Sequence, residues 1–254
     1  MLKKASPSYI RKSIYGPEPG QRAAELPGIG CLELRSLFPD IPKEIFTEGG
    51  DLSVIRKATK ESLRNVNMDI ILPKDKVNIL SSQYGYQIMG GEDYTEMIKT
   101  IKDVVEERTG CKNIRLRVTT GFRIREPNEI IRHYKLDEYF NGNALGVRPI
   151  DRGVPIETEI GTLYGVAQVY DSDWIIHAHH GELRELDMHR MINRAIKPFS
   201  MSYARMETRA VAHMNFGPRS SNFIARVIFE SAFVQSKFTF GWFLLTSPQG
   251  VIGV

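Results

Sequence analysis

Hydrophobic and polar positions follow two patterns in the middle of this chain of 254 residues, one typical of a strand and one typical of a helix. From Asn113 to Thr119, aliphatic residues alternate with arginines, which predicts a strand with one polar face. Apolar residues recur at helical spacing between Asp93 and Gly110. Glu96 follows Asp93 as in a capping box, and Gly110 suits the helix end. A β-branched run at 77–80 predicts a strand before this helix. Strand, helix and strand joined by short turns indicate a parallel sheet.

The same patterns extend over the rest of the chain. Further strands are expected at 174–177, 238–245 and 251–254, and further helices at 52–66, from 127, at 157–170, 183–196, 203–214 and from about 221. Residues 81–85 and 137–143 are expected to be polar connections, and Arg152–Gly153 a turn. We therefore predict an α/β domain over residues 51–254, with an open, mostly parallel, Rossmann-like sheet flanked by helices. Residues 1–50 form an irregular segment rich in Pro and Gly.

Composition narrows the classes of protein. Hydrophobic residues make up 42% and charged residues 25%, as in ordinary globular domains. No run of eighteen apolar residues is present, so no spanning helix is expected, and the basic start Met1–Lys4 is not followed by the apolar segment of a secretory signal. Cys31 and Cys111 are far apart, which argues against a disulfide scaffold and fits a reducing cytoplasm.

The charge balance bears on partners. The formal net charge is +4, which favours small anionic substrates. There is no basic run and no basic–aromatic interleaving, so nucleic acid is not the expected partner. The irregular N-terminal segment could contact a second copy, domain or subunit.

Three of the six histidines lie together at the end of an apolar run, at His177, His179 and His180. On a strand, His177 and His179 point to one side and His180 to the other. The pair could bind a metal with a third ligand from Glu182, His189 or His213, or could move protons without a metal. A buried strand followed by a polar turn would also produce this pattern.

Arginines follow the strand that ends at Thr119. Arg123 and Arg125 lie on the loop there and could hold a carboxylate by forked hydrogen bonds, or could simply be surface residues. The sequence lacks the motifs of three other kinds of site. It has no GxSxG of a serine nucleophile, no HExxH of a zinc metalloprotease and no GxGxxG of a dinucleotide-binding loop.

Two segments together resemble the N-terminal domain of the nickel-dependent lactate racemase family. They are the turn Arg152-Gly153-Val154-Pro155-Ile156 and the strand from Asp173 to His179. The loop Thr119-Thr120-Gly121 is similar to a loop of that family. The resemblance spans roughly residues 75–180 and implies an α/β fold, racemisation of 2-hydroxy acids, and a nickel-pincer nucleotide bound through a lysine.

The resemblance also implies roles for individual residues. His179 matches the first histidine of a Gly-His-x-x-Pro-His motif whose second histidine has no counterpart here. We therefore expect an isomerase acting on a small 2-hydroxy acid, or a non-catalytic protein that binds a ligand or a divalent metal. The expected catalytic residues are His179, His177 and Arg123; the cofactor-binding residues are Lys197, Arg125 and Arg152; the metal ligands are His180 and His189.

Overall fold

Six strands form one sheet in the computed structural model, which describes residues 34–37, 39–40, 42–87, 91–120, 125–182, 195–215, 217–247 and 250–254. The strand order is β3-β2-β1-β6-β7-β8, and all neighbours are parallel except β7 and β8. The strands are β1 (Lys76–Ser82), β2 (Asn113–Thr119), β3 (Ala144–Val147), β6 (Trp174–Glu182), β7 (Phe238–Ser247) and β8 (Gly250–Gly253). A separate hairpin consists of β4 (Gly153–Thr158) and β5 (Gly161–Val166).

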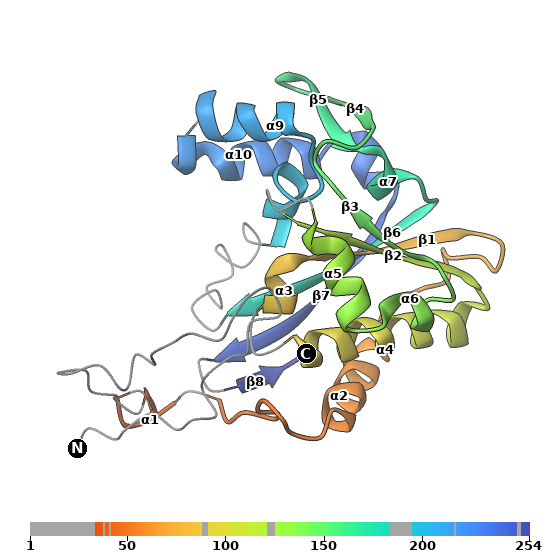
Figure 1. Cartoon of the computed structure of the whole chain (residues 1–254), viewed down its shortest axis with the longest axis vertical. Helices are drawn as coiled ribbons and strands as arrows, with labels where there is room; N and C mark the ends of the chain where they lie inside the picture. The colour runs from red at the N-terminus through yellow and green to blue at the C-terminus, as the bar shows by residue number, and fades with distance from the viewer. Residues whose placement is uncertain are drawn as a thin grey trace.

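Alternation along the central strands divides the interior into two cores. Ile79 and Ile176 face one core, which also contains buried side chains of α2 (Ser53–Leu63) and α4 (Glu92–Thr109). Leu80 and Ile175 face the other, with side chains of the hairpin and of α10 (Gly217–Phe229). Figure 1 shows α2 and α4 on one side of the sheet and α9, α10 and the hairpin on the other.

Short helices connect or cover the sheet. They are α1 (Leu34–Leu37), α3 (Gln83–Gln87), α5 (Glu126–His133), α6 (Leu136–Tyr139), α7 (Ala167–Tyr170), α9 (Met206–Ala210), a π-helix (Val211–Asn215) and α11 (Ala232–Gln235). Residues 195–200 are also helical. No helix within the described ranges is long and apolar enough to cross a membrane.

The strand order creates a topological switch point. The chain proceeds outward from β1 through β2 to β3, then returns to place β6 on the other side of β1 and continues to β7. In open α/β sheets, ligands bind outside the carboxyl ends of the strands where the order reverses. Here that place lies between the carboxyl ends of β1 and β6.

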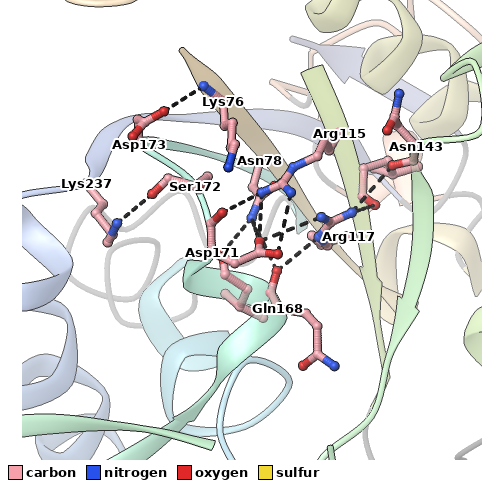
Figure 2. A network of polar contacts seen from close by, with 12 residues as sticks. Lys76, Asn78, Arg115, Arg117, Asn143, Gln168, Asp171, Ser172, Asp173 and Lys237 are labelled. Carbon is pink, nitrogen blue, oxygen red and sulfur yellow. Dashed lines mark hydrogen bonds and ion pairs between the residues drawn. The ribbon is translucent and has the colours of Figure 1, made fainter. Parts of the chain in front are cut away.

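A polar network fixes the connection that leads into β6 (Figure 2). Arg115 of β2 donates to the backbone carbonyl and the carboxylate of Asp171, and Arg117 lies 3.6 Å from the same carboxylate. The side-chain amide of Asn78 on β1 donates to Asp171 and to two carbonyls of α7. Burial, together with the neighbouring charge of Arg115, lowers the pKa of Arg117 to about 10. Because these groups satisfy one another near the amino ends of the strands, their role is to hold β6 in place.

The helix predicted over 157–170 is wrong. Residues 153–166 form the hairpin instead, and only Ala167–Tyr170 is helical. Ile156, Leu163 and Val166 are buried, whereas Tyr164 is exposed. The chain turns at Gly161, whose φ of +108° suits glycine, and Thr158 donates to the Gly161 carbonyl. The expected turn at Arg152–Gly153 is also displaced, since β4 begins at Gly153.

Most other elements lie where the patterns predict them. The α/β class, the parallel sheet, β2, α4 and the two C-terminal strands are confirmed. The capping box expected at Asp93 is wrong, because α4 begins at Glu92 and its N-cap is Gly91. The helix expected at 183–196 lies outside the described residues except for its last two positions. The polar connections are wrong in part, because α3 occupies residues 83–87 and α6 occupies 136–139. Strand β3 was not predicted. Phe46 is buried in the core, and its backbone pairs with Val251 of β8.

Candidate functional site

Strands β1 and β6 separate at the switch point. Their pairing runs from Val77–Trp174 to Leu80–His177, although both strands continue further. Tyr94 of α4 lies at this divergence, and its hydroxyl donates to the carbonyl of Ala178 over 2.7 Å. Gly85 allows this approach, since a Cβ there would lie 2.3 Å from the Tyr94 ring. Beyond His177, in the described part of the sheet, β6 is no longer paired with β1 and continues beside β7 alone.

His177 is a buried, neutral imidazole. It is 2% exposed, and its Nδ1 lies 2.7 Å from the hydroxyl of Tyr203. Burial lowers the pKa of His177 to about 4, although the backbone of Ala195 acts in the opposite direction. The ring is therefore uncharged at neutral pH.

Tyr203 determines how that imidazole is presented. Burial raises the pKa of Tyr203 well above its ordinary value, and the nearby phenols of Tyr94, Tyr170 and Tyr86 act in the same direction. The hydroxyl therefore keeps its proton, and donating it to Nδ1 of His177 satisfies a buried donor. In that arrangement Nε2 of His177 carries the ring proton. Nε2 is itself buried, and it makes no hydrogen bond of normal geometry within the described residues.

His179 lies beside His177 on the same face of β6. The two ring centroids are 5.5 Å apart, and the ring of Phe243 meets His179 edge-on at 5.4 Å. His179 is 7% exposed. The strand thus delivers two imidazoles to one place, as the alternation of side chains predicts.

His180 faces the opposite core. Its Nε2 lies 3.2 Å from the hydroxyl of Thr246 on β7. Its neighbour Ala178, on the same side of the strand, belongs to the core that α4 covers. His180 is therefore not brought together with His177 and His179.

A cavity of about 290 Å³ lies against His177. Its walls come from strand β7, from the helical residues 195–200 and from α10. The lining residues are His177, Ala195, Ile196, Phe199, Phe229, Phe238, Gly241 and Phe243. The cavity therefore combines an apolar wall with one neutral imidazole, a composition typical of small-molecule sites.

Arg209 contributes a cation near the same edge of the sheet. It is 2% exposed, and it donates to the carbonyl of Ala204 over 2.9 Å and to that of Thr120, just beyond β2, over 3.3 Å. Burial lowers its pKa to about 10, so the guanidinium stays charged at neutral pH. It joins α9 to the carboxyl end of β2.

The remaining predicted site residues lie in several places. Arg123 and His189 fall outside the described residues. Arg125 is exposed at the start of α5, and Arg152 is exposed just before β4. Lys197 is half-buried and does not line the cavity. At about 100° per residue, Lys197 lies on the opposite face of its helix from Phe199, which does line the cavity.

These positions test whether the residues fit the nickel-pincer nucleotide that the sequence resemblance implies. Among the described residues, no group of three or more His, Cys, Asp or Glu side chains could hold a metal ion. His180 faces away from His177 and His179, and Lys197 lies away from the cavity. The described side chains therefore do not form the set of groups that this cofactor would need.

Two site residues were missed in the sequence. Tyr203 lies 26 positions after its partner His177, and only the fold joins them. Gly241 lines the cavity from the middle of an aromatic strand. A glycine inside a strand often marks a bulge or a place where another group approaches closely, and that signal could have identified it.

Fold and site together define an α/β protein with an apolar cavity near a topological switch point. Among solved structures, the lactate racemase apoprotein from Thermoanaerobacterium thermosaccharolyticum superposes with a TM-score of 0.56 and 13% sequence identity. The match covers 78% of this chain and 51% of that one, so the chain spans about half the length of the solved structure. No family model and no curated protein matches the sequence. The chain thus has a lactate racemase-like fold.

Proposed function

We propose that this protein is a racemase or epimerase that acts on a small 2-hydroxy acid beside His177 and His179. The observation that carries the proposal is the pair of imidazoles, 5.5 Å apart on one face of β6, where the strand order reverses. The likeness to a lactate racemase apoprotein supports it at the level of the fold. Inversion at a hydroxyl-bearing carbon requires groups that accept and return protons, which imidazoles do near neutral pH.

The two histidines take different roles in this proposal. A base works best when its pKa lies near the working pH, and burial lowers the pKa of His177 to about 4. His177, held by Tyr203, therefore orients the substrate by a hydrogen bond from Nε2. His179, next to it, takes the proton from C2 of the substrate to leave an enediolate, and a proton returned to the opposite face of C2, from the imidazolium or from water, gives the other enantiomer. No step is assigned to nickel or to a pincer nucleotide, because the described residues do not fit them.

A second candidate is a ligand-binding protein without turnover. The observation that favours it is the same low pKa of His177, since a neutral imidazole serves recognition better than proton uptake. Both candidates use the same cavity, so ligand binding alone cannot separate them.

Chiral chromatography of enantiopure 2-hydroxy acids incubated with the purified protein separates the two candidates. Appearance of the opposite enantiomer supports the isomerase. His179→Asn should then reduce the rate by about 10²- to 10⁴-fold, the usual contribution of a positioned acid or base. His133→Gln is the matched control, because His133 is exposed on α5 and remote in sequence from β6.

Binding measured by calorimetry completes the test. Binding without conversion by the unmodified protein would favour the non-catalytic candidate. Conversion that survives His179→Asn unchanged would refute the role of His179. Intact mass and metal analysis of the same sample detect a lysine adduct or bound nickel. Either finding would contradict the conclusion that the described residues do not fit that cofactor.

A further inference from the structure

We infer that the cavity beside His177 takes an aromatic group, so that the ligand is a 2-hydroxy acid with a phenyl-sized side chain. The acid part of this assignment rests on the proposed function, whereas the aromatic part rests on the cavity alone. The cavity holds about 290 Å³. An apolar cavity of about 150 Å³ is enough to take benzene. A ring with a short polar chain therefore fits, and a lactate-sized molecule would leave most of the space unfilled.

The walls suit a ring. Phe229 lies edge-to-face with Phe199 at 5.1 Å and with Phe238 at 4.9 Å, and Phe243 lines the cavity as well. Aromatic pairs favour this edge-to-face geometry. A further ring in the cavity would extend the same packing, while a carboxylate among these phenylalanines would lose its hydration without a partner.

Gly241 creates the space beside His177. The two residues are partners in the β6–β7 pairing, so their Cα atoms are neighbours across the sheet. A Cβ at Gly241 would meet Phe243 at 3.6 Å and both Phe238 and the His177 carbonyl at 3.8 Å. These are ordinary contacts, and no strained φ requires glycine there. A larger residue would be sterically acceptable at its Cβ but would reduce the cavity, which makes Gly241 a determinant of ligand size.

His177 supplies the polar contact inside this wall. Its Nδ1 is engaged by Tyr203, and its Nε2 is buried without a hydrogen-bond partner of normal geometry among the described residues, so a small shift of the wall would let a hydroxyl or carbonyl oxygen of the ligand bond to Nε2. Because the imidazole of His177 is neutral, it suits an uncharged oxygen of the ligand and does not attract the carboxylate. The ligand is thus an aromatic ring carried close to one hydroxyl, with its carboxylate outside the apolar part of the cavity.

Calorimetry with 3-phenyllactate and lactate as probes tests the assignment. The unmodified protein should bind 3-phenyllactate about 10- to 100-fold more tightly than lactate, the gain expected from burying a phenyl group. Gly241→Val should reduce 3-phenyllactate binding at least tenfold and change lactate binding less than threefold, and Gly241→Ala should fall between. Gly253→Ala is the matched control: it lies in β8 of the same sheet, with nothing within 4 Å of an added Cβ.

The outcomes separate this assignment from the proposed function. Equal affinity for the two acids, no binding of 3-phenyllactate, or undiminished binding by the folded Gly241→Ala variant would overturn the assignment. If 3-phenyllactate binds and Gly241→Val blocks it but nothing is racemised, the aromatic cavity stands and the racemase proposal fails. If lactate is racemised and 3-phenyllactate binds no more tightly than lactate, the racemase proposal stands and the aromatic assignment fails.

Discussion

Acidification should destabilise the folded protein through His177. Burial lowers its folded pKa to about 4, whereas an imidazole in the unfolded chain has a pKa of about 6.5. The unfolded state therefore binds the extra proton first as the pH falls. The stability that the neutral ring contributes is complete above about pH 6.5 and is lost progressively down to about pH 4. The full loss corresponds to about 3 kcal/mol.

The loss over a convenient range can be worked out. At pH 5 the unfolded imidazole is about 97% protonated and the folded one about 10%. The contribution of this group to the free energy of unfolding then falls by about 2 kcal/mol between pH 7 and pH 5. Urea unfolding followed by circular dichroism at the two pH values measures it.

Variants isolate the contribution of this imidazole. His177→Asn keeps a hydrogen-bonding group near the position of Nδ1 for Tyr203 but does not titrate, so its loss of stability between pH 7 and pH 5 should be about 2 kcal/mol smaller than in the unmodified protein. His133→Gln, on the exposed surface of α5, should leave the loss unchanged. An identical pH dependence in His177→Asn and the unmodified protein would refute the account of a buried neutral imidazole.

Two further substitutions test the parts that position the site. Asp171→Ala removes the carboxylate shared by Arg115 and Arg117, and should lower the free energy of unfolding by about 2 kcal/mol because Arg117 is only 5% exposed; urea titration with no measurable change would contradict the structural role of the network. Gly85→Ala should cost about 1–3 kcal/mol, because the added Cβ would lie 2.3 Å from the Tyr94 ring; a melting temperature equal to that of the parent would show that this contact does not constrain α3.

The local spacing of apolar and polar residues was sufficient to predict an element where only a strand or only a helix could produce that spacing. In β2, three apolar residues alternate with Arg115 and Arg117, and a helix would have mixed them on every face. In α4, the end at Gly110 follows from a left-handed φ of +72° that glycine adopts easily.

Residues 157–170 show where local pattern was insufficient. Their apolar side chains are compatible with one helical face and also with a twisted hairpin. The hairpin forms because the chain reverses next to Gly161 and because Tyr164 and Leu163 pair with Pro155 and Ile156. Tertiary packing sets that pairing. Strand β3 has only four residues, with a weak burial pattern, and its place at the edge of the sheet depends on β2.

In the candidate site, too, some features follow from local pattern and others depend on tertiary packing. That His177 and His179 share a face, and that His180 does not, could be deduced from the period of a strand. That Tyr203 engages His177, and that Gly241 lies beside it across the sheet, could not, because both contacts depend on how distant segments pack. The sequence therefore identified the strand that carries the candidate site but not the chemical character of the cavity next to it.

The cavity and the low pKa of His177 have one physical cause. Gly241 leaves space beside the imidazole, and phenylalanine rings line that space. The same surroundings disfavour the imidazolium and favour an aromatic guest. Proton binding to His177 and ring burial therefore oppose each other, because a bound ring would displace water from the space beside the charge. Since a base that resists protonation contributes little to proton transfer at neutral pH, the chemistry of the proposed racemase falls to His179, while His177 and Gly241 decide which acid binds.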